Sequence, residues 1–162
     1  MPASRPLVSR MLEARGIQHR VHPFDRGIRS APEVAAALGV DPSRVLKTLV
    51  VETAPPSARP FLLMAPAADT VDLKALARLL GLKALRMASH AEAERVTGLK
   101  VGGISALRLI GKGFGVLLAE SALLQNTVFV SAGERGFEVE LSPDDLARVT
   151  GARFVDLRAG SA

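Results

Sequence analysis

The clearest alternation of apolar and polar residues lies near the C-terminus of the chain. Between Phe137 and Leu141, apolar residues alternate with two glutamates, Glu138 and Glu140. This period of two predicts a half-buried β-strand, because successive side chains on a strand point to opposite faces. Two runs, a largely apolar one at 45–51 and an apolar one at 61–65, predict buried strands instead.

Helical spacing marks a second kind of segment. Leu7, Val8, Met11 and Leu12 fall on one helical face, and Gly16 stands where such a helix would end. Other helices are predicted from capping residues at their starts and, for most of them, glycines at their ends. These segments run from Ser30 to Gly39, from Asp69 or Asp72 to Gly81, from Ser89 to about Val96, and from Ser142 to Gly151.

The order of these segments sets the expected fold class. Further strands are expected at 17–24, 107–110, 116–119, 127–131 and 154–156. Strands and helices interleave irregularly, with hairpins expected late in the chain, which favours an α+β fold with a mixed, barrel-like sheet flanked by helices. No linker or repeat interrupts the pattern, so residues 1–162 are expected to form a single domain.

Composition narrows the function classes. The chain has no cysteine, which excludes disulfides and thiol chemistry, and no apolar run of the roughly 20 residues that a membrane span needs. The N-terminus has no apolar signal segment, so a cytoplasmic protein without a membrane partner is expected. The net charge is +5, and five cations between 86 and 112 outnumber two acids, which favours an anionic partner.

A single lysine in a buried strand is the first candidate for chemistry. Lys47 lies within the apolar run 45–51, where it shares a face with Val45, Leu49 and Val51. Burying an ammonium group is unfavourable unless it meets an anionic partner or serves a function. The alternative is an edge lysine whose head reaches water.

The second candidate is a glycine loop. Gly102 and Gly103 are followed by Ile104 and Ser105, and paired glycines can expose backbone N–H groups to an oxyanion. An ordinary turn is the alternative. His19 and His22 lie three apart on an expected strand and therefore face opposite sides, so neither a metal nor another cofactor is expected.

These pieces together resemble the YbaK-type aminoacyl-tRNA deacylases, which are related to the editing domain of bacterial prolyl-tRNA synthetases. The resemblance covers about residues 7–156 and rests on four motifs in order. They are V-L-K-T-L-V-V at Val45, V-D-L-K at Val71, T-G-L-K-V-G-G-I-S at Thr97, and V-F-V-S-A-G-E-R-G-F-E-V-E-L at Val128.

The resemblance implies a function and a site. Such proteins hydrolyse the ester of wrongly charged tRNA, often tRNA for proline carrying a small amino acid. The family's strand lysine corresponds to Lys47, expected to hold the phosphate or terminal adenosine of the acceptor end. Its loop corresponds to 102–106, whose N–H groups would face the aminoacyl carbonyl. Substrate contacts are expected from Phe24, Thr48, Ala106, Ser131, Gly133 and Glu138.

Three positions depart from the family pattern. Ala106 replaces the usual loop proline, Phe24 replaces an aromatic hydroxyl of cysteine-specific members, and Glu138 replaces an aspartate. These changes argue against cysteine as the amino acid that is removed. Glu138 is expected either to receive the substrate's α-ammonium group or to face solvent as a partner of Arg135.

The expected reaction is hydrolysis of an ester that is already activated. Loop N–H groups would stabilise the oxyanion, and water or the ribose hydroxyl would supply the proton path. Prolyl-tRNA synthetase is a candidate partner that would supply specificity for the tRNA body. Two rival functions stay open: a non-catalytic module that binds tRNA acceptor ends or a synthetase, and a hydrolase of other small esters or nucleotides.

Overall fold

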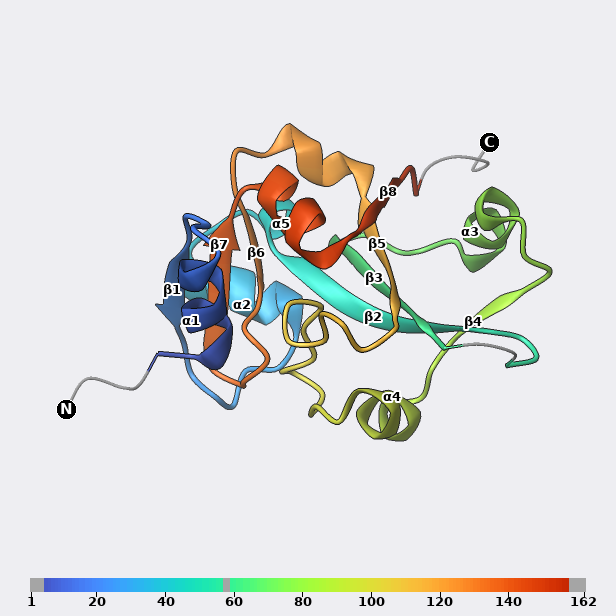
Figure 1. Cartoon of the computed structure of the whole chain (residues 1–162), viewed down its shortest axis with the longest axis horizontal. Helices are drawn as coiled ribbons and strands as arrows, with labels where there is room; N and C mark the ends of the chain where they lie inside the picture. The colour runs from blue at the N-terminus through green and yellow to red at the C-terminus, as the bar shows by residue number, and fades with distance from the viewer. Residues whose placement is uncertain (1–4, 57–58, 158–162) are drawn as a thin grey trace.

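Eight strands form two sheets in the computed structural model, which describes residues 5–56 and 59–157 (Figure 1). The larger sheet has the order β4-β2-β3-β5-β8. Its central strand β3 is antiparallel to β2 and parallel to β5, so the sheet is mixed as the sequence predicts. The strands are β2 (Leu46–Thr53), β3 (Phe61–Pro66), β4 (Leu85–Met87), β5 (Gly115–Ala119) and β8 (Arg153–Val155).

The smaller sheet is antiparallel and has β7 (Phe137–Leu141) at its centre, between β1 (Arg20–Pro23) and β6 (Val128–Ser131). The predicted hairpin is confirmed for β6 and β7. The two sheets meet at a parallel bridge between Val45 and Phe129. Within the described residues the sheets do not close on themselves, so a barrel is not confirmed.

Local capping signals fix the starts of four helices. The side chains of Ser30, Asp72, Ser89 and Ser142 each accept a hydrogen bond from the backbone N–H three residues later. They begin α2 (Ala31–Leu38), α3 (Leu73–Leu80), α4 (His90–Thr97) and α5 (Pro143–Thr150), and α1 spans Leu7–Ala14. Two short 3₁₀ helices, η1 (Pro42–Arg44) and η2 (Glu120–Leu124), complete the helical elements that the structure describes.

The predicted strand at 107–110 is wrong. This segment forms consecutive turns, with Arg108 N–H donating to the Ser105 carbonyl and Leu109 N–H to that of Ala106. Leu107 and Leu109 are nevertheless buried in the core. The alternation of Leu107 and Leu109 therefore arises because both side chains are buried, although the segment pairs with no strand. The sequence also gave no signal for β4, which is only three residues long and exposes Arg86 and Met87.

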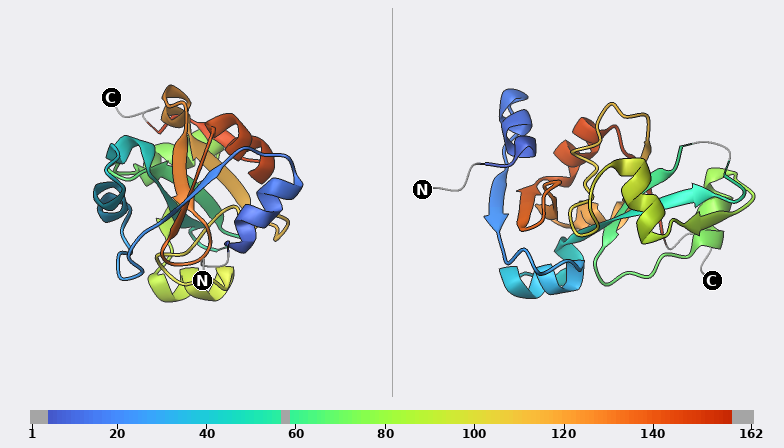
Figure 2. Two further views of the ribbon diagram at one scale, coloured as in Figure 1. Left: turned by 90° about the vertical axis from the view of Figure 1, so that its left-hand side faces the viewer. Right: turned by 90° about the horizontal axis from the view of Figure 1, so that it is seen from below.

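The main hydrophobic core lies between the two sheets and is closed by α1 and α5. On β2, Leu46 and Val50 enter this core, whereas Val51 packs on the opposite face against α3. A third cluster joins α2 to Val45 and Phe129. Figure 2 shows α1 and β1 at one end of the molecule and α3 and β4 at the other. β2 and the residue just before it, Val45, therefore contribute to all three clusters.

Candidate functional site

A pocket of about 350 Å³ lies beside the middle of β2 and contains most of the predicted site residues. Its walls come from β2, the start of α2, the start of α4, the glycine loop and the β6–β7 hairpin. Lys47, Thr48, Gly102, Ile104, Ser131 and Glu138 all line it. A larger cavity of about 620 Å³, between α1, β1 and α5, contains none of the predicted site residues.

Lys47 is half-buried and is held by backbone carbonyl groups. Its ammonium group donates to the carbonyl oxygen of Ala67 at 3.3 Å and to that of Asp69, both in the segment that follows β3. Within the described residues it forms no ion pair with a carboxylate. The carbonyl groups therefore position the ammonium and leave its charge available to an anion.

Two residues of the glycine loop line the pocket and have N–H groups without an acceptor among the described residues. Gly102 and Ile104 line the pocket, and their N–H groups donate to no group in the described part of the chain. Gly103 differs from the expectation, because its N–H donates to the Lys100 carbonyl at 2.7 Å and closes a turn. The candidate oxyanion donors are therefore Gly102 and Ile104.

Gly102 must be glycine for two reasons. Its φ of +91° is unfavourable for residues with a side chain. A Cβ atom at this position would also lie 3.1 Å from both Cβ and Cγ of Arg29. The first atoms of the Arg29 side chain thus cover the loop, and Arg29 lines the pocket as well. No pattern in the sequence connects Arg29 to the glycine loop.

The other predicted loop residues lie behind the pocket. Ser105 is buried and its hydroxyl accepts a hydrogen bond from Leu107 N–H. Ala106 is buried in the main core and is the second residue of the turn closed by Arg108 N–H and the Ser105 carbonyl. Proline is favoured at this position of such turns, which explains how the family's usual proline fits here.

Besides Ala106, two further predicted substrate contacts do not line the pocket. Phe24 packs against the α2 cluster, so its missing hydroxyl makes no direct difference to the pocket wall in this structure. Gly133 donates its N–H to the Ser131 hydroxyl at 3.1 Å and lies under the side chain of Arg108. It therefore supports Ser131, which does line the pocket.

Glu138 is the unusual side chain of the pocket. Only 6% of it is exposed, and its Oε2 atom has no hydrogen-bond partner among the described residues. Burial raises the pKa of Glu138 to about 8. The expectation of a solvent-facing acid paired with Arg135 is wrong, because the Arg135 guanidinium donates to the Val101 carbonyl at 2.9 Å instead.

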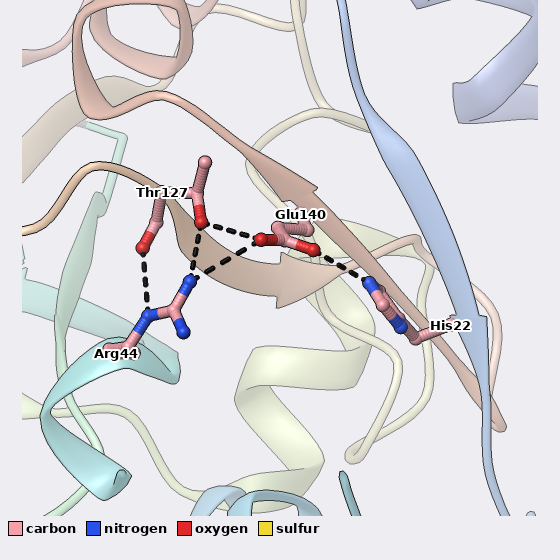
Figure 3. A network of polar contacts seen from close by, with 4 residues as sticks. All are labelled: His22, Arg44, Thr127 and Glu140. Carbon is pink, nitrogen blue, oxygen red and sulfur yellow. Dashed lines mark hydrogen bonds and ion pairs between the residues drawn. The ribbon is translucent and has the colours of Figure 1, made fainter. Parts of the chain in front are cut away.

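Glu140, two residues further along β7, has the opposite environment (Figure 3). It accepts hydrogen bonds from Thr127 at 2.6 Å and His22 at 2.9 Å, and Arg44 lies 3.3 Å away. Burial raises the pKa of Glu140, but these hydrogen bonds and the positive charges of His22 and Arg44 outweigh burial and lower it. The network joins β1, β7 and η1, so it has a structural role.

Two of the three histidines, His19 and His22, are engaged in such structural contacts. His22 binds Glu140, while the two ring nitrogens of His19 contact the Ser9 hydroxyl and the Ile17 carbonyl. In the described part of the chain, no three side chains of His, Cys, Asp or Glu gather in a way that could hold a metal ion.

Three arginines surround the glycine loop and the neighbouring hairpin, and we call them the arginine rim: Arg26, Arg29 and Arg108. Their side chains lie against Gly136, Gly102 and Gly133, respectively, where a Cβ atom would approach them to between 2.7 and 3.1 Å. All three are exposed, and none forms an ion pair with a described residue. The rim therefore places uncompensated positive charge beside the pocket.

Among the described residues, no helix has the length and apolar character that crossing a membrane would require. Two solved structures share the fold. A hypothetical protein of known crystal structure aligns with a TM-score of 0.81 and 28% identity, over 92% of this chain and 97% of its own. A proposed trans-editing enzyme for prolyl-tRNA synthetase aligns with a TM-score of 0.76 and 26% identity, over 95% of this chain and 98% of its own.

Sequence comparisons agree with the structural ones. The proposed Cys-tRNA(Pro)/Cys-tRNA(Cys) deacylase EbsC of Enterococcus faecalis is 33% identical over 150 residues, which cover 91% of this chain and 90% of EbsC. The sequence pattern of the aminoacyl-tRNA editing domain matches residues 25–149, a segment that includes every predicted site residue except Phe24. The chain therefore belongs to the aminoacyl-tRNA editing domain family.

Proposed function

We propose that this protein is a trans-editing deacylase that hydrolyses the ester of mischarged tRNA, with tRNA for proline carrying a small non-cognate amino acid as its substrate. The observation that carries the proposal is one pocket lined both by Lys47, whose ammonium is held by carbonyl groups and not by a carboxylate, and by Gly102 and Ile104, whose N–H groups have no acceptor among the described residues. EbsC and the trans-editing enzyme support the choice of tRNA for proline, and the latter supports prolyl-tRNA synthetase as a partner.

The proposed mechanism relies on positioning. Lys47 holds a phosphate of the acceptor end, which places the aminoacyl ester against the glycine loop. Water attacks the carbonyl carbon, and the N–H groups of Gly102 and Ile104 bind the resulting oxyanion, each contributing about 3 kcal/mol to the transition state. The attacking water loses a proton as it adds, and the leaving ribose oxygen receives that proton through a second water or through the neighbouring ribose hydroxyl, which is regenerated. The products are the free amino acid and uncharged tRNA.

Pocket size limits the amino acid. The cavity of about 350 Å³ must hold the amino acid and part of the terminal nucleotide. Thr48, Ala93 and Ile104 are among the residues that line it. Small side chains such as that of alanine therefore fit better than large ones, although each methylene changes selectivity by only about 1–3 kcal/mol.

A Lys47→Ala variant tests the proposal directly. We expect kcat/KM for tRNA for proline that is charged with alanine to fall by about 10²-fold, because a charge-assisted contact to a phosphate is lost. The measurement is steady-state release of amino acid at catalytic protein concentrations, across tRNAs charged with different small amino acids. Lys74, on the exposed side of α3, is the control, and Lys74→Ala should retain full activity. Undiminished turnover by Lys47→Ala would remove the proposed role of the lysine.

The same assay separates the rival functions. A binding module would show tRNA affinity without multiple turnover by the wild-type protein. A hydrolase of unrelated small esters would act on free esters in the absence of tRNA.

The arginine rim gives a second prediction. Arg108→Gln keeps the side chain over Gly133 and removes its charge. We expect weaker binding of uncharged tRNA and a slope of log affinity against log salt that is shallower by about one unit. Affinity measured between 50 and 200 mM KCl by fluorescence anisotropy provides the slope. Arg153→Gln on β8 is the matched control, since Arg153 is also exposed and unpaired within the described residues. Equal slopes for the two variants would show that the rim does not contact tRNA.

A further inference from the structure

One group of the substrate has no partner in the mechanism above. Lys47 and the glycine loop account for the phosphate and the ester, whereas the α-amino group of the amino acid, which is cationic in its protonated form, is unassigned. An ammonium group that enters a pocket loses water and needs a hydrogen-bond acceptor in return. The pocket must therefore contain such an acceptor if the amino acid binds within it.

Glu138 is the one carboxylate group among the described residues that line the pocket. It lies opposite Ser131 in the register of β6 and β7, so both side chains are on the face of the small sheet that α2 covers. The cationic side chains of the pocket, Arg29 and Lys47, have no hydrogen-bond acceptor, so Glu138 is the side chain there that can balance the charge of an ammonium.

The environment of Glu138 differs from that of a structural acid. Its neighbour Glu140 is surrounded by three donors, whereas Oε2 of Glu138 is buried without any. Buried carboxyl groups without partners are rare and unfavourable. An unpaired acceptor inside a ligand-sized cavity therefore indicates that the ligand supplies the missing donor.

We propose that Glu138 releases its proton to solvent when the substrate binds, that the resulting carboxylate binds the free α-ammonium group of the substrate, and that the pocket consequently selects esters of amino acids with an unblocked amino group. Esters of N-acylated amino acids, including peptidyl esters, and of α-hydroxy acids are rejected. This proposal rests on the deacylase function proposed above. It adds a substrate class: the enzyme discriminates by the charge at the α-position as well as by side-chain size.

Three esters of one tRNA test the proposal. Alanyl-tRNA carries the free ammonium, N-acetylalanyl-tRNA has a neutral and larger group, and lactyl-tRNA has a hydroxyl of nearly the same size. The lactyl ester separates charge from size. The rate with enzyme is divided by the spontaneous hydrolysis rate of each ester, for the wild-type protein and for Glu138→Gln and Glu138→Asp.

For the wild-type protein we expect kcat/KM for the alanyl ester to exceed that for the lactyl ester by about 10–100-fold. Glu138→Gln should lower kcat/KM for the alanyl ester alone, by a similar factor. The values of kcat/KM for the alanyl and lactyl esters then become nearly equal. Glu138→Asp, which keeps the carboxylate, should restore part of the preference. Equal wild-type rates on the alanyl and lactyl esters, or an equal loss on both in Glu138→Gln, would overturn the proposal. If no ester is hydrolysed faster than it decays spontaneously, the deacylase function itself fails.

Discussion

Replacing Glu138 with glutamine is expected to stabilise the folded protein by about 3 kcal/mol at pH 7. The gain should be close to zero at pH 4.5 and should grow by about 1.4 kcal/mol for each pH unit up to pH 8. Urea unfolding of both proteins at several pH values between 4.5 and 9 measures it. A single mutation that stabilises a protein by several kcal/mol is uncommon, because most substitutions destabilise.

The sign follows from the two protonation states of Glu138. In the unfolded chain its pKa is near 4.5, whereas burial raises the pKa in the folded protein to about 8. Between these values the folded state retains a proton that the unfolded state has lost, so the stability of the wild-type protein falls as pH rises. Glutamine does not ionise and lacks this dependence. The part of the difference in unfolding free energy that does not change with pH reports how well the amide fits. The part that changes with pH reports the ionisation of Glu138.

Glu140→Gln is the matched control on the same strand. The folded pKa of Glu140 is lowered, so its carboxylate stabilises the fold at pH values above its unfolded pKa and loses this contribution as pH falls through its folded pKa. Glu140→Gln should therefore destabilise the protein at pH 7, and the difference should shrink in acid. If the two variants had the same pH dependence, Glu138 would not be buried as the structure shows.

The contrast between the two glutamates shows what the sequence can predict. Alternation along 137–141 correctly predicted a strand, because that pattern depends only on neighbouring residues. It also suggested that Glu138 faces solvent, which is wrong. Both faces of β7 are covered, one by the main core and the other by α2, about a hundred residues earlier in the chain. No local pattern contains that information.

The functional site shows the same difference between features set by neighbouring residues and features set by distant ones. Capping serines predicted where α2, α4 and α5 start, because the hydrogen bond that stabilises each start spans only three residues. Ordered motifs indicated Lys47 and the glycine loop, which the fold brings to one pocket. Arg29 was missed, since its contact with Gly102 joins residues 73 positions apart and neither residue type requires the other. Gly103 was predicted to be an oxyanion donor, but its N–H closes a local turn instead.

A Gly102→Ala substitution is expected to lower kcat/KM for a misacylated tRNA by about 10²-fold. The new methyl group would lie 3.1 Å from Cβ and Cγ of Arg29 and 3.4 Å from its Cα. Cα and Cβ of Arg29 are fixed to its backbone, so either this backbone or the glycine loop must shift. A shift of a few tenths of an ångström takes the N–H groups of Gly102 and Ile104 away from the position where the oxyanion forms.

Gly98→Ala separates this effect from backbone strain. Gly98 ends α4 with a φ of +71°, and a Cβ atom there meets nothing within 4 Å. Alanine in a left-handed conformation costs about 1–2 kcal/mol of stability at either glycine. Gly98→Ala should therefore lose stability but retain activity, whereas Gly102→Ala should lose both. Similar activity of the two variants, measured well below their unfolding temperatures, would show that the loop N–H groups do not bind the oxyanion. Loss of activity in Gly102→Ala alone would support the loop N–H groups as the oxyanion donors.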